Sequence, residues 1–322
     1  EKVNEPEMNI NKNTDQCSCK GIRTCNICEK SKESILMSKL KESEHEINQD
    51  VSNELIVKES IIKVANEGSD LINSTNSNHN MMNLRSVGIH DYSIENTKTP
   101  LFSGFYILSN VFSLEEIDSI LQEVNLTEWS DSQSGRKKQD FGVKVNYKKR
   151  KIKSDPSTIK FPSYKTLIEQ RIGLIYSSLQ KEYNNKPKDS NIKQALEILQ
   201  NYSIHEIGNL QYEPDRGSHI EPHYDDAWIW GNRIFGLNLL SDTAMSFSQE
   251  VNIEIEKEEE EEGRKERFEV TVPIRKNDMY LMSGVSRYRW KHGIKKEYIK
   301  EKRIVITCRE FIPELTENYK MK

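Results

Sequence analysis

The 322-residue sequence predicts a mainly β fold of the α+β class, a jelly roll or β-sandwich with supporting helices on its N-terminal side. Two observations carry this prediction. From Pro100 onward, two amphipathic helical segments precede a series of short apolar runs separated by turn signals. In one of these runs, Phe268, Val270, Val272 and Ile274 occupy every second position, so that strand is expected to bury one face and expose the other.

The folded part begins with a strand and turn over residues 104–112 and a helix over residues 114–124. Ser113 is placed to cap this helix, and Glu116, three residues later, completes a capping box. Apolar residues at helical spacing predict a second helix over residues 164–183. The later strands are expected at residues 201–207, 234–240, 268–274, 278–282 and 303–308.

Residues 1–98 differ in composition from the rest of the chain. The spacing of apolar residues between Glu29 and Lys63 favours one or two exposed helices, and the Asn- and Ser-rich residues 66–83 are typical of a linker. We therefore expect three parts: a cysteine-rich segment (1–30), a polar linker that is helical or disordered (31–98) and one folded domain (99–315).

Composition limits the class of protein. The net charge of −4 gives no global basic excess of the kind that nucleic-acid-binding domains carry. There is no apolar run of about 18 residues, and the first residues lack the apolar core of a secretory signal. Four of the five cysteines cluster between Cys17 and Cys28, which fits a reducing compartment. A soluble monomer in the cytoplasm, the nucleus or both is expected, with no membrane contact.

The segment from Arg216 to Gly231 holds the first candidate site. His223 and Asp225 are two residues apart, so on an extended chain both side chains point to one place. Two histidines and a carboxylate on one side of an ion form the usual site of non-haem Fe(II) oxygenases. His292, between two expected strands, is the best-placed third ligand. Spacing alone leaves two alternatives open, a solvated polar turn and the equally spaced pair His219 and Glu221.

A second candidate site lies on the last strand, where Arg303 and Arg309 flank an apolar centre and face the same side. A buried guanidinium requires an anion, and its fork matches a carboxylate such as that of 2-oxoglutarate. At roughly 3.3 Å per residue the two Cα atoms lie about 20 Å apart, so the two arginines are expected to have different partners. The alternative is that both extend to water at the strand ends.

Together, Tyr212, His223-x-Asp225, His292 and Arg303-x5-Arg309 resemble the AlkB family of Fe(II)/2-oxoglutarate dioxygenases, in order and spacing. The resemblance is closest to the AlkB homologue four subgroup. It covers residues 17–28 and about 100–312, and three segments carry it: Cys17 to Cys28, Gln139 to Lys151, and Pro222 to Gly231.

The resemblance implies a double-stranded β-helix, which is a jelly roll, with His223, Asp225 and His292 as iron ligands. It also implies that Tyr212 and Arg303 hold the distal carboxylate of 2-oxoglutarate, that Arg309 lies nearer its keto-acid end, and that residues 129–153 form a substrate lid. One position departs from the family: Leu210 stands where the family's N-x-Y element has asparagine, which leaves the role of Asn209 open.

The activity that the resemblance implies is oxidative N-demethylation, most directly of monomethyl-lysine in actin, and so a role in actomyosin function. The basic stretch from Arg136 to Lys153 favours the alternative of a nucleic-acid demethylase acting on N6-methyladenine or another methylated base. That stretch could equally be a solvated face. A third alternative is a non-enzymatic metal-binding scaffold, which would need neither arginine.

The remaining features have two interpretations each. Cys17, Cys19, Cys25 and Cys28 could bind a structural zinc ion, or form a redox pair or free thiols. Trp228 and Trp230 are expected to pack in the core rather than to line a substrate cage. Cys308 is expected to be a buried core thiol, and the acidic residues 254–262 a solvated loop.

Overall fold

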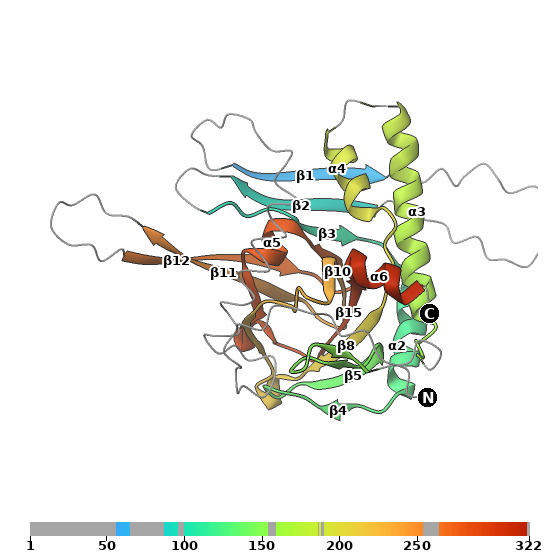
Figure 1. The fold of residues 1–322 in the computed structure, drawn as a ribbon, viewed down its shortest axis with the longest axis vertical. Coiled ribbons are helices and arrows are strands. Elements are labelled where there is room, and N and C mark those ends of the chain that lie inside the picture. The colour runs from blue at the N-terminus through green and yellow to red at the C-terminus, as the bar shows by residue number, and fades with distance from the viewer. Residues whose placement is uncertain are drawn as a thin grey trace, which may run out of the picture.

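The computed structural model describes residues 56–64, 87–95, 100–153, 159–185, 187, 190–253 and 264–320. Two antiparallel sheets face each other, and helices run along the outer side of the larger sheet (Figure 1). The mainly β class and the supporting helices are therefore confirmed, and the two facing sheets are layered as in a jelly roll.

The larger sheet has nine strands. In spatial order they are β1 (Ile56–Val64), β2 (Val87–Glu95), β3 (Phe105–Ser109), β13 (Met279–Met282), β10 (Trp230–Leu239), β15 (Arg303–Phe311), β8 (Glu206–Tyr212), β5 (Lys137–Gly142) and β4 (Ser130–Asp131). The four strands of the smaller sheet are β12 (Arg264–Ile274), β11 (Thr243–Ile253), β14 (Lys291–Ile294) and β9 (Ile220–His223).

Shorter elements complete the fold. The hairpin β6 (Val145–Asn146) and β7 (Lys151–Ile152) follows β5. The helices are α2 (Leu114–Leu126), α3 (Tyr164–Asn185), α4 (Ser190–Leu199), α5 (Gly284–Tyr288) and α6 (Pro313–Lys320). Among the described residues, no helix is both long enough and apolar enough to span a membrane.

The alternation of side chains along β15 separates two cores. Ile304, Ile306 and Cys308 point to the helices and join a core with apolar residues of α2, α3 and α4. Val305 points the other way, into a second core between the two sheets, and Arg303 and Arg309 share its parity. The polar residues of the candidate site are therefore directed into the space between the sheets.

Both helices predicted from periodicity are present as α2 and α3. The capping box of α2 is confirmed, because Ser113 Oγ accepts from the Glu116 backbone N–H at 3.2 Å and Ser113 N–H donates to Glu116 Oε2 at 2.8 Å. The thiol of Cys308 is buried, as expected.

Two local predictions were wrong, and two elements were not predicted. Strand β1 lies where helices were expected, and five of its nine residues are Ile or Val, which fit a strand better than a helix. Helix α4 and strand β11 were not foreseen, although Ile192, Ala195, Leu196 and Leu199 have helical spacing and are buried. The strand expected at 201–207 begins at Glu206 and extends to Tyr212, because pairing with β15 sets its position. The four clustered cysteines and residues 254–262 lie outside the described residues.

Candidate active site

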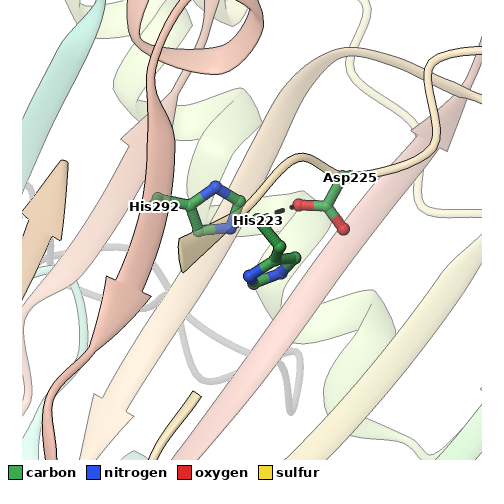
Figure 2. A group of neighbouring side chains, drawn as sticks. All are labelled: His223, Asp225 and His292. Carbon is green, nitrogen blue, oxygen red and sulfur yellow. Dashed lines mark ion pairs between the residues drawn. The ribbon is translucent and has the colours of Figure 1, made fainter. Parts of the chain in front are cut away.

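His223 and His292 face each other on neighbouring strands. They are register partners in the pairing of β9 with β14, and their ring centroids are 4.4 Å apart. Asp225 follows two residues after the end of β9, and ligand atoms of all three side chains lie within 4.8 Å of one another. Figure 2 shows the His292 ring and the Asp225 carboxylate turned toward each other, with the His223 ring beside them.

Close strand approach makes this arrangement possible. A Cβ atom on Gly293, the residue after His292, would lie 2.7 Å from the Ile220 carbonyl oxygen of β9. Only glycine leaves room for the two backbones at this point. The third strand, β11, places Phe247 as the register partner of His292 on its other side, so the backbone of His292 is fixed between two strands.

The protonation states suit a divalent cation. Burial lowers the pKa of His223 and lowers that of His292 well below its usual value, so both rings are neutral. Burial alone would raise the pKa of Asp225, but the nearby cations, Arg309 first, outweigh it and hold that pKa well below its usual range.

His223 Nδ1 lies 2.9 Å from the Glu221 carbonyl oxygen, which can only accept a hydrogen bond. Nδ1 therefore carries the proton, and Nε2 is left to coordinate a metal ion. A carboxylate and two neutral imidazoles form a fitting ligand set for Fe(II).

Two arginines hold Asp225 in place. Arg309 donates to Asp225 Oδ1 from Nε at 3.0 Å, and its Nη2 lies 2.9 Å from the same oxygen. Arg287, which is fully buried on α5, donates from Nη1 to the Asp225 backbone carbonyl at 3.1 Å. The sequence analysis missed Arg287, and its only signal was an arginine five residues before His292.

Arg303 occupies a different environment. Only 1% of the residue is exposed, and its Nε donates to Asn238 Oδ1, a partner that the sequence analysis did not single out. Its Nη1 is buried and has no hydrogen-bond partner among the residues that the structure describes. An unsatisfied buried donor costs about 1–3 kcal/mol, so this guanidinium is suited to an incoming anion. Arg303 and Arg309 thus have different partners, as their spacing predicted.

No protein-family model matches the chain. A DNA N6-methyl adenine demethylase of Caenorhabditis elegans is 29% identical over 94% of this chain and 88% of that protein. The human protein named alpha-ketoglutarate-dependent dioxygenase alkB homolog 4 is 28% identical over 93% of this chain and 87% of its own length. The mouse protein of the same name is 29% identical over 93% and 88%.

The chain is thus similar to AlkB homologue four proteins over most of its length.

The resemblance inferred from the sequence motifs is therefore confirmed, and the names of the relatives, a 2-oxoglutarate-dependent dioxygenase and a demethylase, support the enzyme class that the motifs predicted. The family implies Fe(II) and 2-oxoglutarate, and the cluster of His223, Asp225 and His292 and the unpaired donor of Arg303 fit both.

Other candidate residues lie apart from the cluster. His219 Nε2 forms an exposed hydrogen bond with Glu221 Oε1 at 3.1 Å. This pair, which has the same spacing as His223 and Asp225, therefore does not join the site. His205 stacks on Phe311 with ring centroids 4.4 Å apart.

Asn209 faces away from the site. It is fully buried, and its Nδ2 donates to Gln139 Oε1 and to the Tyr164 hydroxyl, each at 2.8 Å. Tyr212 lies three residues farther along β8, on the opposite face, and is the register partner of Arg303. Asn209 therefore joins the sheet to helix α3, which answers the question that the altered N-x-Y element raised.

Residues 129–153, expected as the lid, form β4 to β7. The β6–β7 hairpin packs Val145, Tyr147 and Ile152 against a small cluster that contains Trp230. Trp230 is 1% exposed and stacks on Phe311 with a centroid distance of 5.9 Å, so the expected packing role of this tryptophan is confirmed.

Proposed function

We propose that His223, Asp225 and His292 hold Fe(II), and that the neighbouring strands bind 2-oxoglutarate in the double-stranded β-helix that the family implies. The observation that carries the proposal is the convergence of the three ligand atoms within 4.8 Å on the inner side of the smaller sheet, opposite the strand of Arg303 and Arg309. In this proposal Arg303 and Tyr212 bind the distal carboxylate, and Arg309 lies toward the keto-acid end while it orients Asp225.

Each part of the site has a defined task. Fe(II) and 2-oxoglutarate, with O2 as the oxidant, would supply the oxidation of an N-methyl group, which is then lost as formaldehyde. The protein supplies fixed ligands, because Arg309 holds the side chain of Asp225 and Arg287 holds its backbone carbonyl. The apolar residues between the sheets exclude water around the reacting groups.

We propose monomethyl-lysine of a protein, with actin as the first candidate, as the substrate, in line with the resemblance to AlkB homologue four. Through it the enzyme would act in actomyosin function, as a monomer in the cytoplasm, the nucleus or both. The alternative, N6-methyladenine in nucleic acid, is supported by the name of the Caenorhabditis elegans relative. A metal-binding scaffold without activity is disfavoured, because such a protein has no use for a buried arginine with an unpaired donor.

Turnover of 2-oxoglutarate to succinate tests the metal assignment. The wild-type protein should form succinate only with Fe(II), and the His223→Ala and Asp225→Ala variants should lose this turnover. His219→Ala is the matched control, because it removes a histidine of the same strand segment that lies outside the cluster. Full turnover in both site variants would show that the ligand assignment is wrong.

A side-by-side assay decides the substrate. The enzyme is offered methylated actin and DNA containing N6-methyladenine under the same conditions, with formaldehyde as the readout. Formaldehyde from actin is the expected result. Formaldehyde from the DNA alone would refute the actin proposal and favour the alternative.

A further inference from the structure

A second arginine, Arg136, lies beside Tyr212 on the strand opposite that of Arg303. Arg136 immediately precedes β5, whose first residue, Lys137, pairs with Gln211 of β8. The next position of this antiparallel ladder places Arg136 beside Tyr212, and Arg303 is the register partner of Tyr212 on β15. Residues opposite each other on neighbouring strands point to the same face. Arg136, Tyr212 and Arg303 therefore form a row across three strands, directed into the space between the sheets.

Both guanidinium groups of this row lie over the same aromatic ring. The Cζ atom of Arg136 is 5.9 Å from the centroid of the Tyr212 ring, and the Arg303 guanidinium also lies over this ring. Arg136 is only 8% exposed, and Tyr212 and Arg303 are fully buried. Two buried cations therefore share one aromatic neighbour, and an anion at the edge of this ring can interact with both.

The protein does not supply an anion for either cation. Arg309, on the same face of β15, binds two carboxylates, those of Asp225 and Glu206. In contrast, no carboxylate of the described part of the chain forms an ion pair with Arg136 or with Arg303. A buried cation without a counter-ion is costly, so such groups are suited to a ligand that brings the anion.

Each of the two arginines is held by its Nε and leaves terminal nitrogens for a ligand. Arg136 Nε donates to the Gln133 carbonyl oxygen at 3.0 Å, just as Arg303 Nε donates to Asn238 Oδ1. Among the described residues, neither Nη atom of Arg136 and no atom near Arg303 Nη1 completes a hydrogen bond, and the Tyr212 hydroxyl has no partner there either. Two guanidinium forks and a hydroxyl donor are the groups that a carboxylate accepts from.

The turn before Arg136 fixes its position before any ligand binds. Gly135 has a φ of +72°, and a Cβ atom there would lie 2.3 Å from the Arg216 carbonyl oxygen, so only glycine fits. The Gly135 carbonyl oxygen accepts from Arg216 Nε and from Ser218 Oγ, each at 2.8 Å. A binding group that is already held in place loses less conformational freedom when the ligand arrives.

We infer that Arg136 binds the distal carboxylate of 2-oxoglutarate together with Arg303 and Tyr212, so that guanidinium groups from both neighbouring strands hold it. The inference rests on the proposed function, which places 2-oxoglutarate beside this row. Arg136 belongs to residues 129–153, the segment expected as the substrate lid, so the co-substrate joins that segment to β8 and β15. Arg136 thereby contributes to the preference for a dicarboxylic acid.

Two acids that differ only at their distal end test the inference without requiring turnover. 2-Oxopentanoate has the carbon chain and the keto-acid end of 2-oxoglutarate, but a methyl group replaces the distal carboxylate. Each acid is titrated calorimetrically into the full chain loaded with Mn(II). The wild type should prefer 2-oxoglutarate. Arg136→Met should weaken the binding of 2-oxoglutarate by about 10–100-fold and that of 2-oxopentanoate by less than about twofold.

Lys137→Met is the matched control, because it removes the next cation of the chain, which points to the other face of the sheet. It should leave both affinities unchanged. A folded Arg136→Met protein with an unchanged preference for 2-oxoglutarate would overturn the inference, and so would an equal loss of affinity for the two acids. A wild-type protein without any preference for 2-oxoglutarate would refute the proposed function and the inference with it.

Hydrogen exchange of the wild type covers the case in which Arg136→Met does not fold. If the distal carboxylate binds Arg136, it stabilises the start of β5, and the amides of residues 132–138 should exchange more slowly with Mn(II) and saturating 2-oxoglutarate than with Mn(II) and saturating 2-oxopentanoate. The amides of α3, which packs on the other side of the sheet, should exchange equally in both complexes. Equal exchange of residues 132–138 in the two complexes would contradict the inference.

Discussion

The Arg303 guanidinium lies over the ring of Tyr212, with its Cζ atom 4.8 Å from the ring centroid. The two residues are register partners on β15 and β8, and both are 1% exposed. A buried cation over an aromatic ring, with one N–H left unpaired, is an environment suited to binding a carboxylate.

Arg303→Met should raise the KM for 2-oxoglutarate by about 10–100-fold, because it removes a charge-assisted hydrogen bond worth about 1.5–3 kcal/mol. Mn(II) affinity without co-substrate should stay near the wild-type value, since Arg303 contacts none of the three proposed ligands. Arg267→Met, which removes an exposed arginine of the smaller sheet, is the control. An unchanged KM would contradict the assignment of Arg303.

Asn238→Leu should weaken the same pocket indirectly. It removes the acceptor of Arg303 Nε and the donor to the Ser241 and Arg275 carbonyl oxygens. Because these groups are buried, the free energy of unfolding should fall by about 1–3 kcal/mol, and the KM for 2-oxoglutarate should rise. Urea denaturation and steady-state kinetics measure the two effects, and a change in neither would show that Asn238 does not support Arg303.

Asn209→Leu should affect stability but not co-substrate binding. Its amide joins β8 to Gln139 and Tyr164 on the helix side of the sheet, so its loss should lower the free energy of unfolding by about 1–3 kcal/mol. The KM for 2-oxoglutarate should remain unchanged. A raised KM in a variant of normal stability would instead place Asn209 in the co-substrate pocket.

Arg309→Lys should lower metal affinity by about 10–100-fold, although the positive charge is retained. Arg309 approaches Asp225 Oδ1 with two nitrogens while a third binds Glu206, and a single ammonium group cannot reproduce this geometry. Titration with Co(II), followed by its absorption spectrum, measures the affinity. Wild-type affinity in Arg309→Lys would mean that Asp225 needs no such support.

Acid should destabilise the metal-free protein. Burial places the pKa of His292 well below the value of 6.5 that it has in the unfolded chain. Below pH 6.5 the unfolded chain therefore binds a proton that the folded protein does not, and folding stability falls as the pH falls. Above pH 6.5 this contribution is complete. The lowered pKa of Asp225 adds a further loss only near its unfolded value of 3.8 and below.

Urea unfolding in EDTA at pH 7.5, 6.5 and 5.5 measures this dependence. The free energy of unfolding should decrease mainly in the lower half of that range. His292→Asn, which has no proton to gain, should show a smaller decrease than the wild type. Equal decreases in the two proteins would show that His292 is not the group responsible.

Local patterns were sufficient for much of the fold. The capping box at Ser113 and the helical spacing after Tyr164 predicted α2 and α3, because helix formation depends on residues three and four apart. Alternation in residues 268–274 predicted the half-buried strand β12, since strand periodicity is equally local. The position of β8 was not predicted, because pairing with the distant strand β15 determines it, whereas the Ile and Val content of β1 was a local signal that the helical interpretation overlooked.

For the active site, the sequence alone supplied the types and spacing of its residues, and through the family resemblance it selected His223, Asp225, His292, Arg303 and Arg309. The spacing of Arg303 and Arg309 predicted different partners, but only the tertiary structure shows which partners they are. Both arginines lie on one face of β15, where Arg303 contacts Asn238 and Arg309 contacts Asp225.

The sequence did not reveal Arg287, Asn238 and Glu206, because each contacts a residue that is distant in the sequence. Arg287 is 62 residues from Asp225, Asn238 is 65 residues from Arg303, and Glu206 is 103 residues from Arg309. Periodicity describes how a segment folds on itself. Which buried charges share a counter-ion depends on strands that meet only in the folded protein.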